Sequence, residues 1–162
     1  RGERMRQNLR RLGLQAEVRV GDAAQADGWW DGRSFDAILL DAPCSASGIA
    51  GRHPDVRWLR RAGDVTRLAQ QQQRLLSALW PLLAPGGRLL YCSCSVFRAE
   101  GEGVVQAFSR WHGDALRLPA PGHRLPPRVP MPTDGSDNGG VESDCFFYAL
   151  LEKRRASNAV AG

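Results

Sequence analysis

The sequences LLDAPCSASG (residues 39–48) and LLYCSCS (residues 89–95) are the strongest indications of the fold class and of a functional site. Each begins with the end of a short apolar run, which is typical of a buried parallel strand. Each run therefore leads into a cysteine-bearing loop at the carboxyl end of a strand, where open α/β sheets place their functional groups. Because Asp41 lies in the first loop, a carboxylate and two thiols are expected to meet at one sheet edge. This combination indicates covalent catalysis rather than packing.

The rest of the chain alternates between helical and strand patterns, which predicts a doubly wound α/β domain. Helices are expected at residues 3–12, 64–83 and 99–112, and strands at 15–20, 35–40, 88–92 and 144–152. Pro81 is expected to kink or end the second helix early, because proline lacks an amide N–H. Residues 117–143 are rich in Pro and Gly and are expected to be irregular. The tail 154–162 is expected to be flexible.

Length and hydropathy predict one globular domain. The chain has 162 residues and 43% hydrophobic residues, enough for a sizeable core. No apolar run approaches the roughly 20 residues of a membrane span, so no membrane association is expected. The N-terminus has neither an initiator Met nor the apolar segment of a signal peptide. We therefore expect a piece of a longer, cytoplasmic protein.

The charge balance is basic, with a net charge of +5 and a pI near 9.6. Such a balance permits a polyanionic partner such as nucleic acid. However, 21 of the 22 basic residues are Arg, a bias that also fits a GC-rich genome. Charge alone therefore does not identify the partner.

The four cysteines are spaced in a way that favours neither a metal site nor disulfides. No C-x-x-C pair is present, so no zinc site is predicted. Disulfides are not expected in a cytosolic chain of this size. Cys145 lies in an apolar run and is expected to be a buried small hydrophobe. Cys92 is expected to face away from the site if Cys94 faces it.

The order of these motifs resembles the NOL/NOP/Sun family of RNA cytosine-5 methyltransferases. The motifs come in this order: a strand with DAPCSASG, a helix, PGG, a strand with YCSCS, and an acidic helix start at Glu100 and Glu102. GIAGRHPDVRWLRR (residues 48–61) and the closing DGSDNGGVESDCFFYALLEK are similar to family members that act on bacterial 16S ribosomal RNA. The resemblance covers residue 3 to about residue 153. It implies a Rossmann-like fold that uses S-adenosylmethionine.

The resemblance also implies that residues 1–153 are the C-terminal part of a catalytic domain. The family's glycine-rich cofactor loop and first two strands would precede residue 1, so the fold would be truncated at its N-terminal side. We expect the S-adenosylmethionine site to be incomplete and the isolated chain to be inactive.

The family's chemistry, carried over by resemblance, gives roles to individual residues. Cys94 would be the nucleophile that adds to carbon-6 of cytosine in RNA, which activates carbon-5 for methylation. Cys44 would take part in releasing the product. Asp41 would contact the cytosine edge near the cofactor, in a protonation state that the sequence does not decide. Asp22 would contact the adenine end of S-adenosylmethionine. No metal is implied.

A free thiol has a pKa of about 8.5, so the nucleophile needs activation. We expect the N-terminus of the helix after Cys94 to supply it through its partial positive charge. The basic pair Arg52-His53 is the second candidate. The arginines of this stretch could hold RNA phosphates or could form a solvated face: Arg52, Arg57, Arg60 and Arg61.

Two other functions compete with this interpretation. In a DNA cytosine-5 methyltransferase, Cys44 would be the attacking residue, and the LLYCSCS loop would then have no explanation. A non-catalytic RNA-binding fragment of a methyltransferase fold would not need Asp41 together with both cysteines. An RNA methyltransferase, with small-subunit ribosomal RNA as its partner, is therefore favoured. The sequence leaves the modified cytosine and the oligomeric state open.

Overall fold

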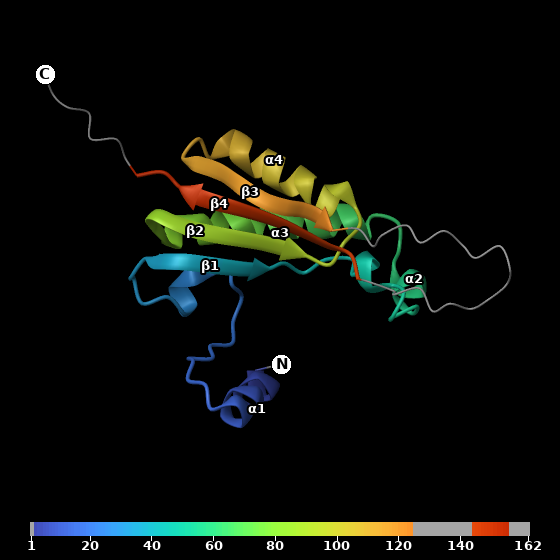
Figure 1. Ribbon diagram of the computed structural model, residues 1–162, viewed down its shortest axis with the longest axis horizontal. Coiled ribbons are helices and arrows are strands. Elements are labelled where there is room, and N and C mark those ends of the chain that lie inside the picture. Colours follow the sequence, from blue (N-terminus) through green and yellow to red (C-terminus); the bar gives the residue numbers. More distant parts are fainter. Residues whose placement is uncertain (1, 125–143, 156–162) are drawn as a thin grey trace, which may run out of the picture.

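The computed structural model describes residues 2–124 and 144–155 as a mixed α/β structure built on one four-stranded sheet. The strands lie in the order β1-β2-β4-β3 (Figure 1). Their bounds are β1 Phe35–Asp41, β2 Leu83–Ser93, β3 Ala115–Arg124 and β4 Phe146–Lys153. The β1–β2 pair is parallel, whereas β4 runs antiparallel to both of its neighbours.

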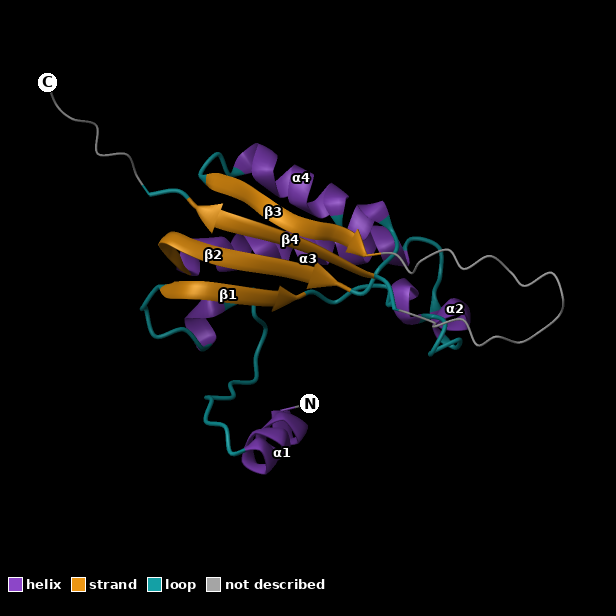
Figure 2. Cartoon of the chain, in the orientation of Figure 1, coloured by secondary structure: helices purple, strands orange, loops and turns teal. Residues whose placement is uncertain are grey.

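Helices α3 and α4 cover one face of this sheet (Figure 2). The helices are α1 Gly2–Leu12, α2 Val56–Leu59, α3 Asp64–Leu79 and α4 Glu102–Trp111, with single turns of 3-10 helix that include η3 Trp80–Leu82 and η4 Arg98–Glu100. None of the residues of α1 is buried, and Figure 1 shows this helix lying apart from the sheet. No helix in the described ranges is long and apolar enough to cross a membrane.

The core lies between the sheet and helices α3 and α4. Alternate residues of β2 and β4 point to the helices, so the hydrophobic side chains on that face are buried: Leu89, Tyr91, Phe147, Ala149 and Leu151. The helices contribute residues at the three- and four-residue spacing of an amphipathic face: Leu75, Leu76, Leu79, Val104, Val105 and Phe108. On the opposite face, Leu90, Cys92 and Tyr148 are only partly buried.

Most of the predicted elements are present. The helices expected at 3–12 and 99–112 and the strands expected at 35–40, 88–92 and 144–152 are confirmed within a few residues. The long helix ends at Leu79, earlier than residue 83, and Pro81 lies in the 3-10 turn that follows, as its missing N–H predicts.

Two predictions of secondary structure are wrong. Residues 15–20 form no strand, because no other described segment pairs with them. Conversely, residues 115–124 form β3 despite Pro119 and Pro121. The sheet tolerates these prolines because β3 is an edge strand and its pairing with β4 is interrupted between Leu118 and Gly122. The remaining residues of the expected irregular segment, 125–143, and residues 156–162 of the expected tail lie outside the described residues.

The parallel pairing of β1 with β2 positions the two cysteine loops. Asp41, the last residue of β1, lies opposite Cys92 near the end of β2. Both strands point the same way, as their arrows show in Figure 1. The loops that follow the two strands therefore begin side by side at one edge of the sheet.

We predict that Leu89→Ala destabilises the chain by about 2–5 kcal/mol, because it leaves a cavity at a fully buried position between sheet and helices. The matched control is Leu39→Ala in the neighbouring strand, where the side chain is 67% exposed. The control should change the free energy of unfolding by less than about 1 kcal/mol. Urea unfolding of the two variants measures both values, and equal losses would contradict the described packing.

Candidate active site

The structure brings the two predicted catalytic cysteines together. The Sγ atoms of Cys44 and Cys94 lie 3.2 Å apart, although fifty residues separate them in sequence. Both side chains are partly buried. Because a nucleobase is several ångströms across, both sulfurs can reach the same base. This juxtaposition is the central feature of the candidate site.

Backbone hydrogen bonds hold the two loops side by side. The amide of Ala42 donates to the Cys92 carbonyl at 2.9 Å, which extends the β1–β2 pairing, and the amide of Gly48 donates to the Cys94 carbonyl at 3.0 Å. The Gly48 carbonyl in turn accepts from the Cys145 amide at 2.8 Å. A Cβ at position 48 would lie 2.1 Å from the Cys145 carbonyl oxygen, so only glycine permits this close approach. Cys145 itself is buried, as predicted.

The two sulfurs share a proton unequally. The hydrogen bond from Cys94 lowers the pKa of the Cys44 thiol to about 7, against the opposing effect of burial, and backbone amides of Ala46 and Cys94 help. The same contact raises the pKa of Cys94 above its ordinary value, and burial raises it further. Near neutral pH, Cys44 is therefore partly ionised, whereas Cys94 stays a thiol.

Neither expected activator lowers the pKa of Cys94. Helix α4 begins only at Glu102, eight residues beyond Cys94, so its N-terminus does not lie next to the thiol in sequence. The Arg52 guanidinium pairs with the Asp144 carboxylate, with one N–O distance of 2.9 Å. The pKa of Cys94 is raised and not lowered, which leaves removal of its proton during attack as the route to activation.

Cys92 lies in the site as well, which corrects the expectation that it faces away. Cys92 lies in β2 opposite Asp41, whereas Cys94 follows the end of that strand. The Cys92 thiol lies 3.7 Å from an Asp41 carboxylate oxygen and 3.6 Å from the Leu40 carbonyl. Burial, followed by the Asp41 charge, raises the pKa of Cys92 to about 11. Cys92 therefore stays protonated near neutral pH and is a poor nucleophile.

The two predicted carboxylates lie in different settings. Asp41 is exposed at the end of β1 beside Cys92. Asp22 accepts hydrogen bonds from the Arg74 guanidinium at 2.7 Å and from the Ala24 amide at 2.9 Å. None of these partners belongs to a cysteine loop, so the structure joins Asp41 to the thiols but does not join Asp22 to them.

Sequence reasoning missed the role of Glu100, which it treated only as part of an acidic helix start. The carboxyl group is fully buried and accepts hydrogen bonds from Ser45 and Ser95, the residues that directly follow the two cysteines. The repeated Cys-Ser pair in both loops was the signal that could have drawn attention to a shared partner.

Arg60 holds the first loop rather than remaining available for RNA. Its Nε donates to the Ser45 carbonyl at 2.7 Å. Arg57 and Arg61 are exposed and stay candidates for phosphate contacts. Among the described residues, no group of three His, Cys, Asp or Glu side chains is placed to hold a metal ion.

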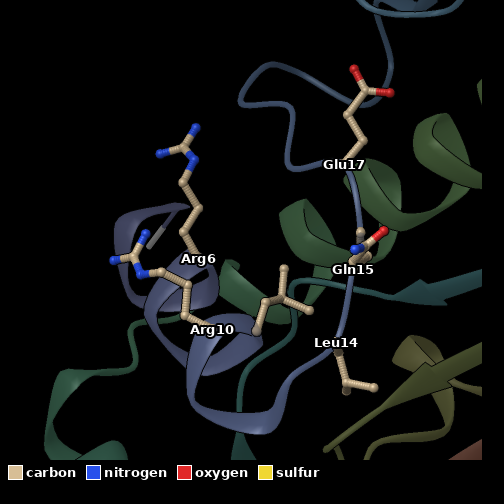
Figure 3. Close-up of a pocket in the computed structure, with 7 residues that line it drawn as sticks. Arg6, Arg10, Leu14, Gln15 and Glu17 are labelled. Carbon is tan, nitrogen blue, oxygen red and sulfur yellow. The ribbon is translucent and has the colours of Figure 1, made fainter.

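A separate hollow of about 540 Å³ lies between α1 and the extended segment after it. Figure 3 shows its lining residues: Arg6, Leu9, Arg10, Leu14, Gln15, Ala16 and Glu17. None of them was a predicted site residue. The candidate site therefore lies in the loops at the carboxyl ends of β1 and β2 and not in this hollow.

We predict that Cys94→Ala slows alkylation of Cys44 by iodoacetamide at pH 7. The variant removes the hydrogen bond that stabilises the Cys44 thiolate, so the pKa of Cys44 rises from about 7 toward its ordinary value and the thiolate fraction falls by about tenfold or more. Peptide mass spectrometry over a range of pH gives the Cys44 rate. Cys92→Ala, which removes a thiol that makes no hydrogen bond to Cys44, is the control. An unchanged pH profile in Cys94→Ala would contradict the shared proton.

Known proteins are similar to this chain in sequence. Residues 1–152 match the model of the family described as 16S rRNA methyltransferase RsmB/F. The chain is 47% identical over 156 residues to Ribosomal RNA small subunit methyltransferase B of Sodalis glossinidius, and 45% identical over 152 residues to the protein of that name in Vibrio vulnificus. Each match covers 94% of this chain and 34% of the relative, so the chain spans about a third of their length.

Solved structures agree with the sequence relatives. The crystal structure of NSun6 from Pyrococcus horikoshii with SFG matches with a TM-score of 0.73 and 25% identity, over 95% of this chain and 39% of that one. A methyltransferase homologue from the same organism matches with a TM-score of 0.68 and 28% identity, over 93% and 49% of the two chains. The fold is thus that of Rossmann-like methyltransferases, and the chain belongs to the 16S rRNA methyltransferase RsmB/F family.

Proposed function

We propose that residues 1–153 are the C-terminal part of a catalytic domain that methylates carbon-5 of a cytosine in RNA through a covalent bond to Cys94. The observation that carries this proposal is the 3.2 Å separation of the Cys44 and Cys94 sulfurs beside Asp41. Carbon-5 of cytosine is a weak nucleophile, and thiolate addition at carbon-6 converts the ring into an enamine-like species that can attack a methyl group.

The unequal proton sharing suggests how a protonated Cys94 can attack. Cys44, as the thiolate, takes the proton of the Cys94 thiol while the Cys94 sulfur forms its bond to carbon-6. Once Cys94 is bonded to carbon-6 it no longer donates a hydrogen bond to Cys44, and the Cys44 thiol returns the proton to solvent in a separate step before it acts again. After methylation, the Cys44 thiolate takes the carbon-5 proton, and the electron pair of that C–H bond re-forms the ring double bond as the Cys94 sulfur leaves. One proton is released in the whole cycle, as methylation at carbon requires.

The residues present fit S-adenosylmethionine, which would supply an electrophilic methyl group. Asp41 offers an exposed carboxylate beside the thiols, where it suits both a cationic sulfonium and the amino edge of cytosine. Asp22 has one hydrogen bond on each carboxylate oxygen, which leaves lone pairs for an adenine amino group. Support also comes from the NSun6 structure, which contains SFG, an S-adenosylmethionine analogue.

The proposed substrate is small-subunit ribosomal RNA, and the proposed location is the cytoplasm. The names of the relatives support this substrate, as does the net charge of +5. The exposed Arg57 and Arg61 follow the first cysteine loop and are suited to phosphate contacts.

A second assignment keeps the chemistry but reverses the sulfurs. The lowered pKa of Cys44 favours it as the attacking residue, the arrangement expected of a DNA cytosine-5 methyltransferase. We favour Cys94, because the family resemblance places the nucleophile in the second loop and because a resting thiolate on Cys44 is the base that an attack by Cys94 needs.

We predict that RNA containing 5-fluorocytosine forms a covalent adduct with the full-length protein that carries this chain, since fluorine at carbon-5 blocks release. The adduct should vanish in Cys94→Ala. In Cys44→Ala it should form more slowly, because the base that assists Cys94 is missing, but it should persist or accumulate once formed. Denaturing gels with labelled RNA measure it, and DNA of the same sequence is the control. Loss of the adduct in Cys44→Ala alone would reverse the two roles.

We also predict that the isolated 162-residue chain does not bind S-adenosylmethionine with micromolar affinity. Within the described residues, β1 has a strand neighbour on one side only, and Asp22 lies on a segment that joins no sheet. A cofactor cradle therefore needs further strands. Calorimetry on the isolated and full-length proteins compares the two, and micromolar binding by the isolated chain would disprove the incomplete site.

A further inference from the structure

Glu100 connects the two cysteine loops from beneath. Its carboxylate accepts from the Ser45 amide at 2.8 Å, from the Ser45 hydroxyl at 2.5 Å and from the Ser95 hydroxyl at 2.6 Å. Ser45 directly follows Cys44 and Ser95 directly follows Cys94, so a single side chain is hydrogen-bonded to the residue after each cysteine.

The surrounding groups fix Glu100 itself. The Gln72 amide donates to its carboxylate at 3.3 Å and to the Pro43 carbonyl at 2.8 Å. The main-chain carbonyl of Glu100 accepts from the Tyr91 hydroxyl at 2.7 Å and from the Ser93 hydroxyl at 3.1 Å. Helix α3 and strand β2 thereby anchor the residue from two sides.

This arrangement is unusual for an acidic residue. The Glu100 side chain is fully buried, and no Arg or Lys among the described residues pairs with it. Burying a carboxylate is costly unless hydrogen bonds compensate for the lost water. All of its partners are donors, so the ionised form, which only accepts, satisfies every one of them. If packing were its only role, an apolar residue would serve without the desolvation cost of a buried carboxylate.

We propose that Glu100 is a positioning residue, which sets the distance between the Cys44 and Cys94 sulfurs by holding the residue after each. The inference rests on the proposed function for its catalytic consequence, but its geometric content is independent of any reaction. The Glu100 side chain is fully buried, so it offers no exposed surface to RNA or to a cofactor.

The first test measures geometry without catalysis, in the full-length protein. Phenylarsine oxide reacts with two thiols that lie close together: two S–H bonds and one As=O bond are replaced by two As–S bonds and water. We expect capture across Cys44 and Cys94, identified by peptide mass spectrometry and abolished by Cys94→Ala. Glu100→Ala should slow capture by at least tenfold, whereas Glu100→Gln, which keeps the length and most hydrogen bonds, should retain it.

The second test measures the rate of methylation. Glu100→Ala should lower kcat by about 100-fold, the order expected for a displacement of about 1 Å, with KM for RNA unchanged within twofold. Glu100→Gln should recover most of that loss. The matched control is Glu102→Gln, because Glu102 lies two residues away and pairs with Arg117. It should leave capture and kcat unchanged.

The outcomes separate the two proposals. Wild-type capture and kcat in a folded Glu100→Ala protein would overturn the positioning role, and so would a loss in Glu102→Gln as large as the loss in Glu100→Ala. If Glu100→Ala does not fold, Ser95→Ala replaces it. This variant removes the hydrogen bond between Glu100 and the Cys94 loop and should slow capture. Wild-type capture in Ser95→Ala would overturn the positioning role. An absence of methylation in the wild type would refute the proposed function, while the capture arm would still decide the role of Glu100.

Discussion

The parallel pairing of β1 with β2 is the constraint on which the site depends. It places Asp41 opposite Cys92 and sends both following loops out of the same edge of the sheet. An antiparallel pair would send the two loops to opposite edges. The packing of α3 and α4 against β2 and β4 stabilises this arrangement. The hydrogen bond from the Tyr91 hydroxyl to Gln72 connects the core to the buried polar groups beneath the loops.

The site combines an apolar core with a compact polar cluster, and the two meet at the cysteine loops. Close hydrogen bonds hold each loop near the other, through Gly48 on the backbone and through Glu100 on the side chains. The chemical result is a pair of sulfurs that share a proton, with the thiolate on one and the thiol on the other. In the proposed mechanism, Cys44 is the base and Cys94 is the nucleophile, and the two lie next to each other.

The sequence was sufficient for the parts of the fold that follow from local pattern. Alternating and periodic apolar residues predicted β1, β2, β4, α3 and α4, and the two Cys loops after apolar runs predicted the meeting of Cys44 with Cys94. Properties that depend on partners were not predictable. Residues 15–20 have a strand pattern but no neighbour, and β3 forms around two prolines because it lies at an edge. The directions of the pKa shifts at Cys44 and Cys94 depended on a sulfur fifty residues away, and the burial of Glu100 depended on donors from three other segments.

We propose that both sulfurs act on one pyrimidine ring. A structure of the full-length protein trapped on RNA that contains 5-fluorocytosine tests this proposal. We expect a bond between Sγ of Cys94 and carbon-6, with Sγ of Cys44 in contact with the same ring near carbon-5. A bond to Cys44 instead, or a ring that lies beyond the reach of Cys44, would contradict it.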